Sequence, residues 1–170
     1  KAALIADRGL FELFENHPID AFRNDQSLLN EAITRAIRVK ADVVERDERE
    51  SGERRKLNLG HTFAHAIEKC GNEFLHGEAV AIGTVMIARL SAHLGTATQD
   101  EADRVRRVFE RMGLPIRTEI DFKRLVKALK HDKKKEADSV SFVLLRGIGD
   151  CEIRRFTFDE IDRLPDPAAE

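Results

Sequence analysis

The stretch GEAVAIGTVMIARLSAHL, which runs from Gly77 to Leu94, decides the fold that this sequence predicts. Its residues are apolar on nearly every side of a helix, whereas a helix at a protein surface carries its apolar residues along one stripe. A helix of this composition is stable only when protein surrounds it. We therefore expect residues 77–94 to form a buried helix.

Helical periodicity also dominates the rest of the chain. Apolar residues recur at helical spacing in residues 2–15 and 26–46, and a short helix is expected over 61–70. Thr98 and Glu101 form a capping-box pattern that opens a helix to about Met112, which the segment GLP at 113–115 ends. A further helix is expected over about 121–130. The charged segment DERESGERRK, residues 47–56, is broken by a glycine and predicts a loop.

The C-terminal part of the chain has a different pattern. SVSFVLL, then RGIGD, then CEIRRF predict two short strands around a glycine-containing turn. Thr157 and Glu160 form a second capping box, and the proline-containing tail after it is expected to be frayed. The sequence therefore predicts one mainly α-helical domain over residues 1–170, a multi-helix domain with a small C-terminal β-hairpin.

The composition narrows the class of protein. A chain of 170 residues with 42% apolar and 35% charged residues can form one domain with a real core. Its formal net charge of −2 and its lack of Trp and Tyr argue against partners such as nucleic acid or an anionic membrane. No apolar run approaches the roughly 20 residues that span a bilayer, and no signal-peptide pattern is present. Two cysteines point to a reducing compartment, so we expect a cytoplasmic protein.

Half of the six histidines fall in one window, NLGHTFAHAIEKCGNEFLHGE, which runs from Asn58 to Glu78. His61 and His65 are four residues apart, which on a helix places them on one face with about 6 Å between their side-chain origins. His76 follows at the start of the predicted buried helix. Two imidazoles so spaced can reach one cation. From spacing alone, a metal site and a polar cluster without chemistry remain equally open.

Cationic and amide side chains precede and follow this window. Arg54 and Asn58 approach the same helix start, and an arginine with an asparagine beside a metal indicates recognition of an oxygen-rich anion. The alternative for Arg54 is a solvated loop, and lysines 133–135 are also more often solvent-facing. Lys40 lies between the apolar residues Val39 and Ala41, which can place it in a partly buried position where its pKa falls and it can transfer protons.

Taken in order, these segments resemble 3-dehydroquinate synthase. The resemblance is carried by RVKADVVERDERESGERRKLNLGHTFAHAIE, LHGEAVAIG, HDKKK and SFVLLRGIGDCEI, and it corresponds to the C-terminal, helical half of that family. It implies a lyase of the sugar-phosphate cyclase superfamily in the shikimate pathway of aromatic amino acid biosynthesis. Such an enzyme converts 3-deoxy-D-arabino-heptulosonate 7-phosphate, a small-molecule sugar-acid phosphate, to 3-dehydroquinate with NAD and a divalent metal, zinc or cobalt.

The resemblance also implies roles for particular residues. His61 and His76 match metal ligands, and His65 and Lys40 match catalytic residues. The positions that match substrate-binding residues are Lys1, Arg54, Asn58, Lys133 and Lys134. The third metal ligand of the family, a glutamate, would lie before Lys1, as would the NAD-binding N-terminal domain. Because the sequence begins at Lys1, within a predicted helix, we expect it to be part of a longer chain, inactive by itself and homodimeric at full length.

Three other readings fit parts of the pattern. Another sugar-phosphate cyclase would keep the metal motif and differ in the residues that bind the substrate's carboxylate. An iron- or zinc-dependent alcohol or glycerol dehydrogenase would share the metal domain but would not need the cluster of Arg54, Lys40 and the HDKKK segment. A stand-alone, non-catalytic helical module would bind neither zinc nor substrate.

Overall fold

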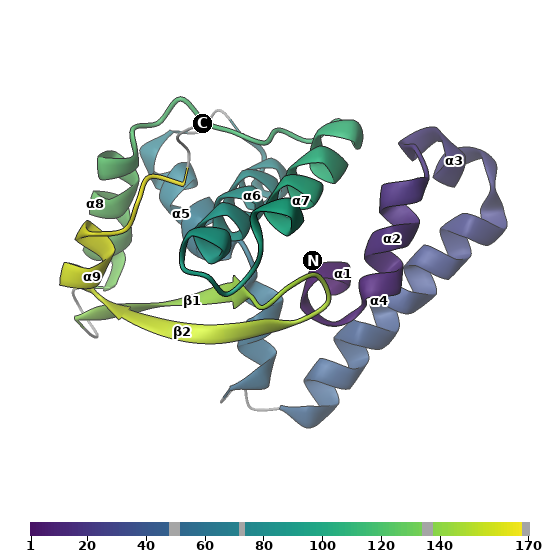
Figure 1. Cartoon of the computed structure of the whole chain (residues 1–170), viewed down its shortest axis with the longest axis horizontal. Helices are drawn as coiled ribbons and strands as arrows, with labels where there is room; N and C mark the ends of the chain where they lie inside the picture. The colour runs from purple at the N-terminus through teal and green to yellow at the C-terminus, as the bar shows by residue number, and fades with distance from the viewer. Residues whose placement is uncertain (48–51, 72–73, 134–137, 168–170) are drawn as a thin grey trace.

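A computed structural model describes residues 1–47, 52–71, 74–133 and 138–167, and within these ranges the chain is mainly α-helical with a two-stranded antiparallel sheet. Figure 1 shows α2, α3 and α4 on one side, α5, α6 and α7 in the middle above the hairpin, and α8 with α9 on the other side. The predicted fold class is confirmed. In chain order the elements are α1 (Ala2–Ala6), α2 (Arg8–Asn16), α3 (Ile19–Asn24), α4 (Gln26–Arg46), the 3-10 helix η1 (Glu53–Asn58), α5 (His61–Cys70), α6 (His76–His93), α7 (Gln99–Arg111), α8 (Phe122–Lys133), β1 (Ser139–Leu145), β2 (Cys151–Thr157) and α9 (Phe158–Asp162).

Helix α6 forms the centre of the core. Every residue from Ala79 to Ala88 is buried, and α5, α7 and β1 pack against it. The two hydroxyl groups in its buried part donate to backbone carbonyls one turn earlier, Thr84 Oγ1 to Val80 and Ser91 Oγ to Ile87, each at 2.7 Å. The prediction that this stretch is a buried helix is confirmed.

The start of α5 lies directly against α6 because two glycines face each other. Gly60 precedes α5 with φ of 80°, a left-handed conformation that glycine adopts without steric cost. A Cβ atom on Gly83 of α6 would collide with the carbonyl oxygen of Gly60 and would lie 3.0 Å from the backbone nitrogen of Ala64. This close approach of two backbones sets the position of His61, the first residue of α5, relative to α6.

The hairpin is held against α5 by an aromatic contact and a hydrogen bond. Its strands pair with Ser139 opposite Thr157 and Leu145 opposite Cys151. Residues 146–150, the predicted turn, connect the paired ends of the two strands. The ring of Phe142 in β1 lies 5.3 Å from the ring of Phe63 in α5, centroid to centroid. Thr62 Oγ1 also donates to the carbonyl of Ser141 at 3.2 Å. Strand β1 therefore contacts both α5, through Phe142 and Ser141, and α6.

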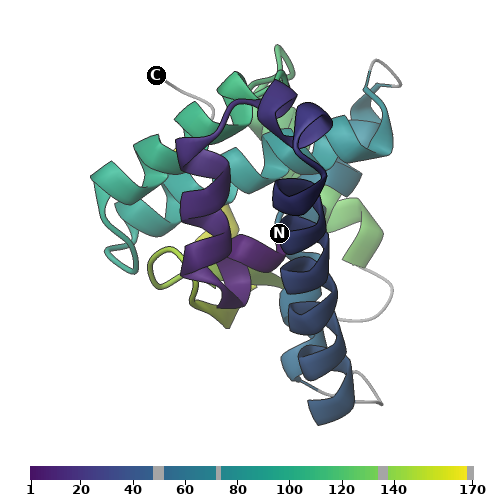
Figure 2. The same ribbon diagram turned by 90° about the vertical axis from the view of Figure 1, so that its right-hand side faces the viewer.

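The N-terminal region differs from the single helix expected over 2–15. The helix breaks at Asp7, whose carboxylate accepts the backbone N–H of Leu10 at 2.9 Å and so caps α2. The same carboxylate pairs with Arg35 of α4 (Nη2 to Oδ1 2.5 Å), beside which α2 runs in Figure 2. Helix α3 was not predicted, because six residues are too few for a clear helical period.

Two further expectations are corrected. The segment 47–56 was expected to be a loop, but residues 53–58 form η1, while residues 48–51 lie outside the described ranges. The tail was expected to be frayed, but Pro167 is buried and its carbonyl accepts from Arg89 Nη1 at 3.3 Å. In the described part of the chain, no helix combines the length and apolar character needed to cross a membrane.

Candidate metal centre

The three histidines of the predicted cluster come together at the N-terminal halves of α5 and α6. The ring centroids of His61 and His76 lie 5.4 Å apart, those of His61 and His65 5.8 Å apart, and those of His65 and His76 6.3 Å apart. Their spacing in the sequence places His61 and His65 on one helix face and puts His76 at the start of the next helix. The addition of His76 depends on the packing of α6 against α5.

His61 and His76 each have one ring nitrogen engaged by an acceptor. His61 Nδ1 lies 3.2 Å from the carbonyl oxygen of Leu59, and His76 Nδ1 lies 2.8 Å from Oε1 of Glu68. A carbonyl and a carboxylate oxygen only accept, so Nδ1 of each ring carries the proton and donates. In a neutral imidazole this leaves the lone pair on Nε2. Metal-binding histidines characteristically have this arrangement.

The surroundings of His61 favour its neutral form. Partial burial lowers its pKa most, and the nearby Lys1, His65 and His76 lower it further, against the opposing effect of the Leu59 carbonyl. Lys1 Nζ lies 3.4 Å from His61 Nε2, so a cation faces the lone pair of this ring. Because only the neutral imidazole binds a metal ion, His61 suits the role of a ligand.

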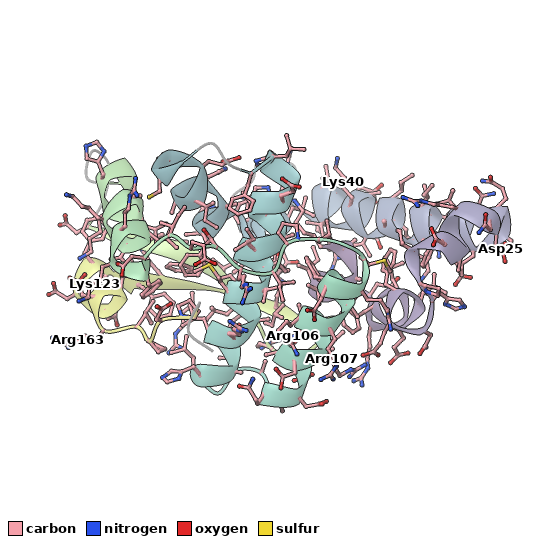
Figure 3. The ribbon with its side chains drawn as sticks, turned by 90° about the horizontal axis from the view of Figure 1, so that it is seen from above. Asp25, Lys40, Arg106, Arg107, Lys123 and Arg163 are labelled. Atoms are coloured by element: carbon pink, nitrogen blue, oxygen red, sulfur yellow. The ribbon has the colours of Figure 1, made fainter. Side chains whose placement is uncertain are left out.

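Lys1 lies next to this cluster, and Lys40 lies near Lys1. The pKa of Lys1 is lowered by burial and then by the charge of Lys40, which places these two side chains near each other. The expectation that Lys40 is partly buried is wrong, because Lys40 is exposed and Figure 3 shows it projecting outward from α4. Its neighbour Val39 is buried instead, since successive residues of a helix point in directions about 100° apart.

Arg54 and Asn58 belong to η1, which leads through Gly60 into α5. Arg54 is half-buried and Asn58 is exposed three residues before His61. The start of η1 is held by the buried Asp47, whose Oδ2 accepts the backbone N–H of Gly52 at 2.7 Å and that of Arg54 at 3.0 Å. This carboxylate therefore sets the backbone position of Arg54.

The HDKKK segment follows α8. Lys133 is the last residue of that helix, but its side chain is not among the described ones, and Lys134 lies outside the described residues. Helix α8 packs against α5, the helix that carries two of the three histidines.

The two carboxylates in the histidine window have separate roles. Glu78 accepts the backbone N–H of Leu75 at 2.8 Å and so caps α6. Glu68 contacts His76, a pairing that sequence reasoning missed although Glu68 lies seven residues after His61, on the same face of α5. Within the described ranges, no group of three or more histidine, cysteine, aspartate or glutamate side chains is arranged so that it could hold a metal ion. A metal held by His61 and His76 would therefore need another ligand.

Solved structures share this fold. The chain matches 2-epi-5-epi-valiolone synthase from Streptomyces hygroscopicus subsp. jinggangensis 5008, solved with NAD⁺ and Zn²⁺ bound, with a TM-score of 0.80 and 29% identity over 95% of this chain and 46% of that one. It also matches 2-deoxy-scyllo-inosose synthase, solved with carbaglucose-6-phosphate, NAD⁺ and Co²⁺, with a TM-score of 0.66 and 22% identity over 82% of this chain and 40% of that one. The fold is that of the sugar-phosphate cyclases.

Within that class, residues 1–135 match the family model described as 3-dehydroquinate synthase C-terminal, and the chain belongs to this family. The 3-dehydroquinate synthase of Pseudomonas fluorescens (strain SBW25) is 46% identical over 161 residues, covering 90% of this chain and 43% of that protein. The 3-dehydroquinate synthase of Nitrosomonas europaea is 44% identical over 152 residues, covering 88% and 41%. The chain thus spans less than half the length of these curated relatives.

Proposed function

We propose that this chain is the metal- and substrate-binding part of a 3-dehydroquinate synthase. The reaction is the conversion of 3-deoxy-D-arabino-heptulosonate 7-phosphate to 3-dehydroquinate with loss of phosphate. The observation that carries the proposal is the pair formed by His61 and His76, whose rings lie 5.4 Å apart at the junction of α5 and α6 in a chain of this family.

The residues at this junction fit a divalent metal such as zinc or cobalt. Both proposed ligands have Nδ1 engaged, so Nε2 is the nitrogen that would bind a cation, and a metal at His61 would displace Lys1 Nζ, which lies 3.4 Å from that atom. Catalytic zinc sites normally use three protein ligands and one open position. We propose that the third ligand is a glutamate outside these 170 residues. A metal bound here supplies Lewis acidity, which lowers the pKa of a coordinated substrate hydroxyl.

The other residues of the site would bind the substrate and move protons. His65 lies one helical turn from His61, with its ring 6.3 Å from that of His76, where an imidazole can exchange a proton with a group next to the metal. The carboxylate and phosphate of the substrate require cationic donors. We assign this binding to the cationic side chains of Lys1, Arg54 and one lysine of the HDKKK segment, Lys133 or Lys134, with the amide of Asn58 as a neutral donor. Lys40 joins this set for its charge, because its exposure removes the reason for a proton-transfer role.

NAD supplies the transient oxidation of a ring hydroxyl in this chemistry. We propose that a nucleotide-binding domain outside these 170 residues holds it. Two observations support this assignment. The sheet in the described residues is a single hairpin, not the parallel sheet typical of dinucleotide-binding domains. The curated relatives are also more than twice as long as the segment that matches this chain.

A second candidate is a cyclase for a different sugar phosphate, which the TM-score of 0.80 to 2-epi-5-epi-valiolone synthase favours. The identity of the sequences argues for the first candidate. It is 29% for that enzyme and 44 to 46% for the 3-dehydroquinate synthases of N. europaea and P. fluorescens. We therefore retain 3-dehydroquinate synthase as the proposed function.

Zinc titration of the chain tests the metal centre. The wild type is expected to bind zinc weakly, because it supplies two of the usual three protein ligands, with an affinity measured by competition with a chromophoric chelator. The double variant His61→Ala, His76→Ala is expected to bind at least about 100-fold more weakly still, because both ligands are lost. His93→Ala is the matched control, since His93 is exposed at the far end of α6. Equal zinc affinity in the wild type and the double variant would contradict the assignment.

A further inference from the structure

We propose that Glu68 is a positioning residue of the metal centre, which holds the His76 ring in the tautomer whose Nε2 binds the metal. The inference rests on the proposed function, because it assumes that His76 is a ligand. It adds a residue that neither the spacing of the histidines nor the comparisons assign. In this proposal Glu68 is not itself a ligand, since its carboxylate contacts Nδ1 of His76 and the metal is assigned to Nε2.

The geometry of α5 places Glu68 for this role. Residues 61, 65 and 68 stand at positions i, i+4 and i+7, so His61, His65 and Glu68 share one face of the helix. Glu68 Oε1 lies 2.8 Å from His76 Nδ1, across the junction between α5 and α6. The contact therefore joins the helix that carries one proposed ligand to the residue that supplies the other.

His76 needs such a contact more than His61 does. The side chain of His76 is 60% exposed, so packing restricts its ring little. His61 is half-buried and donates to the carbonyl of Leu59. The position of this acceptor is set by the backbone two residues before His61. One proposed ligand is thus oriented by backbone and the other by a side chain. Only the second arrangement can be removed by a single substitution.

The contact has a chemical consequence as well as a geometric one. A carboxylate accepting from Nδ1–H fixes the proton on that nitrogen and makes Nε2 a stronger donor to a metal ion. An exposed His–Glu pair contributes little to folding, because water competes for both groups. The expected effect of Glu68 therefore lies in the metal centre and not in the stability of the chain.

The first experiment measures the tautomer directly. Nitrogen-15 chemical shifts of the metal-free chain at pH 8, where exposed imidazoles are neutral, distinguish a protonated from an unprotonated ring nitrogen. In the wild type, His76 is expected as the Nδ1–H tautomer. In Glu68→Ala it is expected to move toward the Nε2–H tautomer, which free imidazole side chains prefer. In Glu68→Gln it is expected to stay closer to the wild type, because the amide oxygen still accepts.

The second experiment measures metal binding on the same variants, with zinc affinity by chelator competition and the visible spectrum of bound Co²⁺. Glu68→Ala is expected to weaken zinc binding by about 10- to 100-fold, the usual loss when such a partner is removed. Glu68→Gln is expected to lose less zinc affinity than Glu68→Ala. Glu110→Gln is the matched control for one lost negative charge, because Glu110 is an exposed carboxylate on α7 paired with Arg106. Its zinc affinity is expected to equal that of the wild type.

The outcomes separate the inference from the proposed function. If His76→Ala weakens zinc binding while Glu68→Ala leaves affinity and tautomer unchanged, the inference is overturned and the metal centre stands. If His76→Ala binds zinc as the wild type does, the proposed metal centre fails and the inference fails with it. If Glu68→Ala lowers the melting temperature of the metal-free chain and its zinc affinity in proportion, the role of Glu68 is structural and the inference is overturned.

Discussion

Single carboxylates organise several of the local structures on which the site depends. Asp47 is buried and accepts two backbone N–H groups at the start of η1, which sets the position of Arg54. Asp7 caps α2 and at the same time pairs with Arg35 of α4. In each case one short side chain satisfies donors that would otherwise cost free energy when taken out of water. At the residue scale, the consequences can be tested one substitution at a time.

Arg54→Lys is expected to damage catalysis although it conserves charge. In an enzyme that joins this chain to a nucleotide-binding domain, kcat/KM should fall by roughly 30- to 150-fold, which corresponds to about 2–3 kcal/mol of transition-state stabilisation. The reason is that an ammonium group cannot reproduce the planar, two-pronged donor geometry of a guanidinium. Steady-state kinetics give the result. Arg55→Lys, at the exposed neighbouring position, should keep wild-type kcat/KM, and an equal loss in both variants would count against the assignment.

Asp7→Asn is expected to lower the stability of the chain in a pH-dependent way. The hydrogen bond from Arg35 holds the pKa of Asp7 below its ordinary value of 3.8. Asn caps a helix as well as Asp does, so the variant keeps the cap and removes the charge together with one of the two oxygens that accept from Arg35, at a cost of about 1–2 kcal/mol at pH 7. The lowered pKa stabilises the folded state only while the carboxylate is charged. The difference in unfolding free energy between the wild type and Asp7→Asn should therefore be fully present above about pH 4 and disappear as the pH falls through the folded-state pKa of Asp7. Urea denaturation at several pH values measures this, and a constant difference from pH 7 to pH 2 would contradict the ion-pair explanation.

At the scale of elements, the metal centre depends on how closely α5 approaches α6. The two helices meet at Gly60 and Gly83, and the proposed ligands His61 and His76 are the first residues of these helices. Strand β1 of the hairpin contacts α5 through Phe142 and also packs against α6. A change in the distance between the helices therefore moves one proposed ligand relative to the other.

Gly83→Ala tests this arrangement. Because the new methyl group would collide with the carbonyl oxygen of Gly60, the variant should lose about 2–3 kcal/mol of unfolding free energy and bind zinc more weakly. Gly77→Ala is the matched control on the same helix, since a Cβ there meets nothing within 4 Å. It should be neutral or up to about 1 kcal/mol more stable, from helix propensity alone. Urea denaturation of both variants gives the comparison, and equal stabilities would show that the close contact is unimportant.

At the scale of the whole molecule, the buried apolar side chains of the described residues form one cluster that includes those of α6, and the proposed site lies at the N-terminal end of that helix. The sites of related cyclases combine NAD⁺ with a metal ion, as the two solved neighbours show. In the proposed division of labour, this chain provides metal and substrate recognition, and a nucleotide-binding domain provides the hydride acceptor.

The chain by itself is therefore expected to show no 3-dehydroquinate synthase turnover. The reaction cannot begin without a bound hydride acceptor next to the substrate. A coupled assay with saturating NAD and zinc tests this, with the P. fluorescens 3-dehydroquinate synthase as the positive control. Turnover by the purified chain that persists after removal of host enzymes, and that His61→Ala abolishes, would show that these residues suffice.

Much of the site could be predicted from the sequence because its histidines lie in one short window. The four-residue spacing of His61 and His65 predicts a shared helix face. The helix expected over residues 61–70 is present as α5, His61–Cys70. The sequence also drew attention to His76, Arg54 and Asn58, and the resemblance added Lys1 and the particular role of each residue, and these roles stay predictions. The contact between Glu68 and His76 could not be predicted, because it joins two helices across their junction.

The sequence by itself determined the helical class, the burial of α6, the capping-box starts of α7 and α9, and the hairpin. These features depend on residues a few positions apart, so local patterns encode them. Only the tertiary structure decided that the first helix breaks at Asp7 and that Lys40 faces solvent. It also decided that Gly60 meets Gly83. Those outcomes depend on partners 20 or more residues away in the sequence, or on which face of a helix packs against the core. The spacing of apolar residues within one segment does not encode either of them.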